Sequence, residues 1–113
     1  MRDFKIKICG ITSINDAIIA INLGANALGF IFYEQSPRSV SIEDVQEIIY
    51  FLPPFVTTVG VFVNADPAYI EKVLRTCKLD IVQLHGDESP QYCMKLDARI
   101  IKAIRVANIS DIE

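Results

Sequence analysis

Close cysteine pairs and histidine clusters are missing from this sequence of 113 residues, and they are the usual signs of a zinc site or a disulfide framework. Its three cysteines stand at positions 9, 77 and 93 and form no CxxC pair. Its one histidine, His85, has no second histidine or cysteine at ligand spacing. We therefore expect no metal and no disulfide, and a reducing, cytoplasmic compartment.

Long apolar runs, basic stripes and dinucleotide motifs are equally scarce. No apolar run approaches the roughly 18 residues that span a bilayer, and residues 1–3 lead into an expected strand without an apolar secretory segment. The net charge is -3, and no basic stripe offers a surface for nucleic acid. No GxGxxG follows an expected strand. We therefore expect no membrane, nucleic-acid or dinucleotide partner.

Apolar material, in contrast, is plentiful. Hydrophobic residues make up 51% of the sequence, which is enough to bury a core in one domain over residues 1–113. They form short β-rich runs that begin roughly every 20–30 residues, the spacing of βα units rather than of hairpins. The expected strands are Phe4–Cys9, Ala27–Phe32, Thr57–Val63, Ile81–Leu84 and Ile100–Val106.

Helix starts separate these strands, each with a side chain that can accept a hydrogen bond from the first turn. Two have the form of capping boxes, and two place the acceptor directly before a proline. They are Ser13-x-x-Asp16, Ser41-x-x-Asp44, Asp66-Pro67 and Ser89-Pro90. Cys77 and Cys93 fall on these predicted helices, where we expect them to be packing residues, and Asn64 is expected to lie in a turn.

The first predicted helix follows Ser13 and has an apolar face. Helical spacing places Ile14, Ala17, Ile18 and Ile21 together on it. Gly24 then offers a left-handed end to the helix.

The last residues also announce a helix. Ser110-x-x-Glu113 is a capping box, and one turn is far too short for a stable isolated helix. We therefore expect a truncated chain of four βα units and a fifth strand. Five such strands fit either a complete flavodoxin-like doubly wound sheet or the first part of a (β/α)8 barrel, which needs about 200–250 residues. The unfinished helix favours the barrel.

The first expected strand ends in a cysteine followed by a glycine, at positions 9 and 10. Because side chains alternate along a strand, one face of this strand is apolar and the other carries two amines and, at its carboxyl end, a thiol. The polar face holds Lys5, Lys7 and Cys9, and the apolar face holds Phe4, Ile6 and Ile8. A cysteine in an apolar strand is usually a small core residue. At the carboxyl end of a strand and beside cations, however, a thiolate can act as nucleophile or base.

Further candidates follow other expected strands. Arg38 comes directly after a Ser-Pro dipeptide and can bind carboxylate or phosphate through two nitrogens. Gln83 and His85 share a face at the end of the fourth strand, where a histidine can bind substrate, order the loop or move a proton. On the fifth strand, alternation sends Lys102 and Arg105 to opposite faces, so only one can point at a central site.

In their order along the chain, these motifs resemble those of phosphoribosylanthranilate isomerases, and the resemblance covers essentially the whole sequence. Any one block is weak, whereas six in order are highly specific. The blocks are KICGIT (7–12), GANALGFIF (24–32), SPR (36–38), VGVFVN (59–64), VQLHGDE (82–88) and IKAIRV (101–106).

The resemblance implies a (β/α)8 barrel that needs no cofactor or metal and rearranges the phosphosugar N-(5'-phosphoribosyl)anthranilate in tryptophan biosynthesis. Carried onto this sequence, Cys9 is the general base and Arg38 receives the anthranilate carboxylate. Lys7, Gln83 and His85 are the further substrate-binding candidates. The family's general acid and its phosphate-binding loops belong to later strands than this chain has. We therefore expect little or no activity from the chain alone.

Three other interpretations stay open. Another phosphosugar barrel, such as a histidine-pathway isomerase, would be expected to carry an acidic residue in place of Cys9. A non-catalytic half-barrel would self-associate, or complement a separate C-terminal half, through the unpaired edges of the first and fifth strands. A five-stranded binding module would have to account for the capping box at the terminus.

Overall fold

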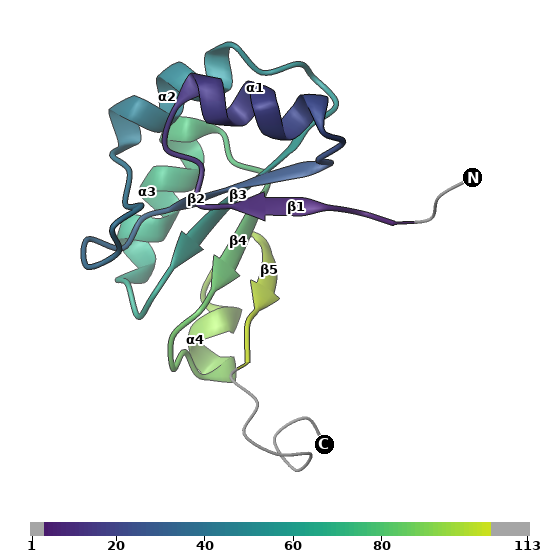
Figure 1. Ribbon diagram of the computed structural model, residues 1–113. Coiled ribbons are helices and arrows are strands. Elements are labelled where there is room, and N and C mark those ends of the chain that lie inside the picture. The colour runs from purple at the N-terminus through teal and green to yellow at the C-terminus, as the bar shows by residue number, and fades with distance from the viewer. Residues whose placement is uncertain (1–3, 105–113) are drawn as a thin grey trace.

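Strands and helices alternate along the chain as the apolar runs predict. The computed structural model describes residues 4–104, within which five strands alternate with four helices (Figure 1). The strands are β1 (Lys7–Cys9), β2 (Ala27–Ile31), β3 (Thr57–Phe62), β4 (Ile81–Leu84) and β5 (Arg99–Lys102). The helices are α1 (Ile14–Asn22), α2 (Ile42–Tyr50), α3 (Pro67–Cys77) and α4 (Pro90–Met94). The expected fifth helix and the last two residues of the expected fifth strand lie outside the described residues.

The order of the strands distinguishes the two expected architectures. All five form one parallel sheet in the order β1-β2-β3-β4-β5. A flavodoxin-like sheet has the order 2-1-3-4-5, because its chain reverses direction at a switch point. A sequential order with right-handed crossovers places every connecting helix on one side, and α1, α2 and α3 lie together there in Figure 1. The fold class is therefore the expected α/β class of the (β/α)8 barrel, with four βα units and a fifth strand.

The predicted strand boundaries hold in the middle of the sheet and fail at both of its edges. β4 covers the predicted residues, and β2 and β3 each end one residue early. β5 begins one residue early and ends at Lys102, so the predicted strand is too long by Ala103 and Ile104 at least. The predicted start of β1 at Phe4 is wrong, because pairing begins only where Lys7 lies opposite Ala27, the first residue of β2. Residues 4–6 precede that point, and the backbone N–H of Ile6 donates to the side chain of Asn26 instead.

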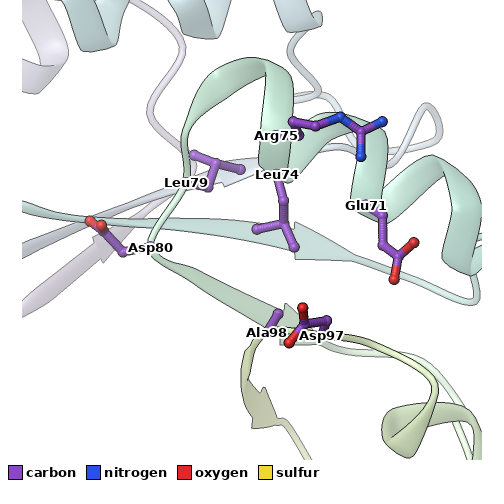
Figure 2. Close-up of a pocket in the computed structure, with 7 residues that line it drawn as sticks. All are labelled: Glu71, Leu74, Arg75, Leu79, Asp80, Asp97 and Ala98. Carbon is purple, nitrogen blue, oxygen red and sulfur yellow. The ribbon is translucent and has the colours of Figure 1, made fainter.

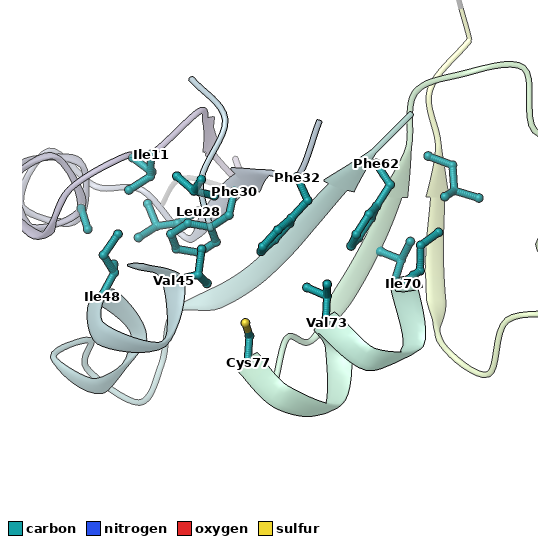
Figure 3. Packing of buried hydrophobic residues seen from close by; sticks show 14 of the residues in the cluster. Ile11, Leu28, Phe30, Phe32, Val45, Ile48, Phe62, Ile70, Val73 and Cys77 are labelled. Atoms are coloured by element: carbon teal, nitrogen blue, oxygen red, sulfur yellow. The ribbon is translucent and has the colours of Figure 1, made fainter. Parts of the chain in front are cut away.

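The hydrophobic core lies between the helices and one face of the sheet (Figure 3). Phe32 and Phe62 stack in it with ring centroids 5.4 Å apart. The residues of α2 and α3 in the cluster are Val45, Ile48, Ile70, Val73 and Cys77. Cys93 packs against the cluster from α4, so the packing roles predicted for Cys77 and Cys93 are confirmed. Neither they nor Cys9 form a disulfide.

The four predicted helix caps are all present. Ser13, Ser41 and Ser89 each accept a hydrogen bond from the backbone N–H three residues on, at 3.1 Å, and Asp66 accepts one from Ala68 at 2.9 Å. None of the helices within residues 4–104 has the length and apolar character needed to cross a membrane.

The predicted apolar face of α1 is partly wrong. Ala17 and Ala20 are its buried residues, whereas Ile18 is 44% exposed. Two alanines on the inner face let the helix backbone approach the sheet. Each residue of a helix is rotated by about 100° from the one before it, so Ile18 points away from the face that Ala17 buries. Gly24 follows the helix with φ +103°, so its predicted left-handed conformation is confirmed.

Candidate active site

Cys9 is the last residue of β1 and is half-buried. It lies opposite Gly29 of β2, and a Cβ on Gly29 would stand 3.1 Å from the Cys9 Sγ. The carbonyl of Gly29 accepts from both Gly10 N–H and Ile11 N–H, each at 3.0 Å. Gly29 thus anchors the turn that ends β1 and leaves space for the thiol beside it.

Arg38 lies across the turn that follows Cys9. Gly10 has φ +86°, and a Cβ built on it would stand only 2.5 Å from Nη1 of Arg38. That nitrogen also donates to the carbonyl of Cys9 at 3.3 Å. Ser36 accepts from the backbone N–H of Arg38 at 3.2 Å, which holds the loop between β2 and α2. The structure therefore brings an exposed guanidinium and the thiol-bearing residue together.

Lys7 and Gln83 are joined by a hydrogen bond from Nζ to Oε1. Lys7 belongs to β1 and the buried Gln83 to β4, so β2 and β3 lie between them. In a flat sheet these strands would be roughly 14 Å apart, at about 4.8 Å per strand. The contact therefore requires a sheet that curls toward the face of Lys7. By alternation Cys9 shares that face, so the three candidate residues Cys9, Lys7 and Gln83 lie on the same, concave side of the sheet.

His85 occupies a different part of the strand ends. It follows β4, its backbone N–H donates to the carbonyl of Phe62 at 2.9 Å, and it is exposed. It lines a cavity of about 460 Å³ with Asn64, Glu88 and Lys102. The cavity thus joins His85 to the loops after β3 and β4.

The question of whether Lys102 or Arg105 faces a central site is answered for Lys102. In the register of β4 and β5, Lys102 lies opposite Leu84, and Ile101 lies opposite Gln83. Lys102 thus belongs to the face opposite that of Gln83, and its amine binds Glu88 at 2.9 Å and the carbonyl of Gly86. Arg105 lies outside the described residues.

Glu88 is a residue that sequence reasoning did not single out. Its side chain is only 1% exposed. Burial raises the pKa of this carboxyl, but hydrogen bonds from Asn64, Lys102, its own backbone N–H and Gly86 outweigh burial and hold it below its ordinary value. In the sequence Glu88 follows Asp87 in an acidic pair, and nothing there distinguishes the buried carboxylate from the exposed one.

A second cavity, of about 410 Å³, lies at the opposite end of the strands (Figure 2). It is lined by α3 and by residues just before β4 and β5, among them Asp80 and Asp97. Chemistry in parallel α/β folds sits at the carboxyl ends of strands, so we assign no catalytic role to this cavity. Within residues 4–104 no group of three or more His, Cys, Asp or Glu side chains gathers as a metal site would require.

Comparison with known proteins shows which family the chain resembles in sequence and structure. Residues 6–113 match the family model described as N-(5'phosphoribosyl)anthranilate (PRA) isomerase. An N-(5'-phosphoribosyl)anthranilate isomerase of Geobacter sulfurreducens is 51% identical over 109 residues, which are 96% of this chain and 54% of the relative. The chain thus spans about half the length of that relative.

Two solved structures are similar to the chain along nearly all of its length. A phosphoribosyl anthranilate isomerase in complex with reduced 1-(o-carboxyphenylamino)-1-deoxyribulose 5-phosphate is 45% identical, with a TM-score of 0.93 over 96% of this chain and 57% of that one. Monomers generated from the dimeric enzyme of Thermotoga maritima are 42% identical, with a TM-score of 0.90 over 96% and 56%.

Proposed function

The chain belongs to the N-(5'-phosphoribosyl)anthranilate isomerase family, and we propose that it contributes the base-bearing part of that family's active site. Residues 1–113 form the N-terminal part of a single (β/α)8 barrel domain in this proposal. The observation that carries it is the pairing of Cys9 with Arg38, whose guanidinium lies across Gly10 at the same strand end.

The proposed reaction is an aldose–ketose isomerisation in tryptophan biosynthesis. Once the furanose ring has opened to a Schiff base, the Cys9 thiolate removes the C2' proton. The electron pair of that C–H bond forms a C1'=C2' double bond while the π pair of the Schiff base moves to nitrogen. The resulting enolamine becomes the ketone of 1-(2-carboxyphenylamino)-1-deoxyribulose 5-phosphate when C1' gains a proton and the C2' hydroxyl loses one. C1' is reduced and C2' oxidised within one molecule, so no external oxidant is needed.

The other residues bind and orient the substrate in this proposal. Arg38 donates two hydrogen bonds to the anthranilate carboxylate, which its planar fork matches in geometry. Lys7 and Gln83 stand on the face of Cys9 and fix polar groups of the sugar, and His85 contacts the substrate from the next loop. The general acid that opens the ring is contributed by a later strand than this chain has.

A chimaera tests the proposal directly. Residues 1–113 are joined to the C-terminal remainder of the Geobacter sulfurreducens relative, and consumption of N-(5'-phosphoribosyl)anthranilate is followed by the fluorescence of its aromatic ring. We expect turnover from the chimaera and little or none from the 113-residue chain. Cys9→Ala is expected to lower kcat by about 10²–10⁴-fold, the usual contribution of a general base.

Cys93→Ala is the matched control, because Cys93 is a packing residue of α4, the helix between β4 and β5. It is expected to keep kcat within a small factor of the parent chimaera. Undiminished turnover in Cys9→Ala would show that Cys9 is not the general base. An inactive parent chimaera would contradict the proposed function.

A non-catalytic half-barrel is the second candidate, and the edges of the sheet favour it. β1 pairs only with β2 and β5 only with β4 within residues 4–104. Ile8 and Ile101, one on each of these edge strands, are 41% and 42% exposed. We propose that these edges take up a C-terminal half or a second copy of the chain. The free cysteines fit a reducing cytoplasm for either candidate.

A further inference from the structure

Glu88 is the centre of a hydrogen-bond network that joins three elements. Its Oε2 accepts from the backbone N–H of Asn64, which follows β3, at 2.8 Å. Its Oε1 accepts from the backbone N–H of Gly86 and from Nζ of Lys102 on β5, each at 2.9 Å. One buried carboxylate therefore ties the loops after β3 and β4 to the end of β5.

The same loops are held together a second way. The side chain of Asn64 accepts from the backbone N–H of Asp87 at 2.8 Å. A Cβ on Gly86 would stand 2.5 Å from the Asn64 Oδ1 and 2.9 Å from the Asn64 backbone nitrogen, so only glycine permits this approach. Asn64 itself has φ +49°, a left-handed conformation that asparagine tolerates.

His85 lies directly beside this network. Its own N–H is fixed to Phe62 by the sheet at 2.9 Å. The next residue, Gly86, is held at its N–H by Glu88 and at its carbonyl by Lys102. The backbone of His85 is thus fixed on both sides, while the residue is exposed and lines the same cavity as Lys102 and Glu88.

We propose that Glu88 and Lys102 are positioning residues that set the place of the His85 imidazole over the strand ends. They touch no reacting atom in this proposal and act only through His85. The proposal deepens the proposed function, because it treats His85 as a residue that contacts the substrate.

The first test uses the 113-residue chain and needs no activity. The sequence has one histidine, so its ring gives one set of carbon–proton cross-peaks in the NMR spectrum of a labelled sample. Glu88→Gln and Lys102→Met are expected to shift and broaden that set, while the amide signals of Gly10 and Gly29 stay in place. Asp87→Asn is the control, because it removes the neighbouring, exposed carboxylate and leaves the network intact.

The second test is a double-mutant cycle in the chimaera. Glu88→Gln is expected to lower kcat/KM by up to about 10²-fold, the size of loss that a displacement near 1 Å can cause. In a His85→Asn background the same substitution is expected to cause little further loss of kcat/KM, because Glu88 acts through the His85 side chain, which is already gone. Asp87→Asn is expected to leave kcat/KM unchanged.

The outcomes separate this proposal from the proposed function. Unchanged His85 signals in both folded variants, or losses in kcat/KM that simply add, would overturn the positioning role. If Glu88→Gln does not fold, Lys102→Met decides by the same signals, since it keeps the carboxylate and its two backbone partners. An inactive parent chimaera would refute the proposed function, whereas the NMR result would still decide the role of Glu88.

Discussion

At the scale of single residues, the candidate site and the loops beside it depend on three glycines, which have no side chain to fill the space next to them. Gly10 makes room for the Arg38 guanidinium, Gly29 for the Cys9 thiol, and Gly86 for Asn64, and a Cβ at each would meet its neighbour at 2.5 to 3.1 Å. Such distances exclude any other residue without a shift of the neighbour. The glycines therefore help to place two of the candidate side chains, Cys9 and Arg38, and the turn residue Asn64.

Gly10→Ala tests this dependence. The added methyl displaces Arg38 and is expected to raise KM of the chimaera roughly 10- to 100-fold, because a hydrogen bond to a charged group contributes about 1.5–3 kcal/mol. Gly24→Ala is the control for backbone strain, since Gly24 also has positive φ but lies at the end of α1. Both variants are expected to lose about 1–3 kcal/mol of folding free energy. An equal rise in KM in Gly10→Ala and Gly24→Ala would show that backbone strain, and not the displacement of Arg38, causes the effect.

At the scale of elements, the helix caps connect the site to the fold. Val40 donates from its backbone N–H to Ile31 at 3.0 Å, and Ser41 then caps α2. The Arg38 loop is thus fixed at both ends, by β2 and by a helix whose Val45 and Ile48 are buried in the core. The position of Arg38 is therefore linked to the stability of α2.

Ser41→Ala is expected to lower the free energy of unfolding by about 1 kcal/mol, the typical cost of losing a capping hydroxyl. Urea unfolding followed by circular dichroism measures it. Ser39→Ala is the matched control, because Ser39 stands in the same loop and caps no helix. Equal losses in the two variants would show that the cap contributes nothing specific.

At the scale of the whole molecule, the main features of the sheet are its curvature and its two unpaired edges. The sheet curls far enough for Lys7 on β1 to bind Gln83 on β4, yet β1 and β5 each have one partner within residues 4–104. A curled parallel sheet with two free edges exposes unpaired backbone groups beside apolar side chains. Such edges favour pairing with another chain.

Ile8→Glu tests the edge of β1. Sedimentation velocity of the 113-residue chain is expected to show a concentration-dependent dimer or larger species. Placing a charge at Ile8 is expected to weaken this association roughly tenfold or more, since burying an isoleucine contributes about 1.5–3 kcal/mol. Met94→Glu is the control, because Met94 is 84% exposed on α4, the helix between β4 and β5, and β1 forms the other edge of the sheet. A monomeric parent chain, or equal weakening by both changes, would contradict the role of the edges.

Local patterns in the sequence predicted what depends on neighbours along the chain. The caps at Ser13 and Ser41 follow from residues three positions apart, and β4 was predicted at its observed bounds because apolar residues on both faces mark a buried parallel strand. Cys9 was found because it ends a recognisable strand, and Arg38 because it lies in the loop after one.

The features that the sequence did not reveal depend on partners far along the chain. β1 was predicted too long because its length depends on where β2 begins, and Ile18 was misplaced because the sheet decides which face of α1 is buried. The curl that joins Lys7 to Gln83, 76 residues apart, is a property of the whole sheet.

The division between sequence and tertiary structure is clearest at Glu88. By itself the sequence determined the alternation of strands and helices, the caps and the candidate residues Cys9, Arg38 and His85, since these follow from local geometry. Only the tertiary structure decided that Glu88 is buried and that Lys102 turns to it rather than to the concave face. The physical reason is that a buried carboxylate is stable only where donors from separate elements converge, and that convergence exists only in the folded chain.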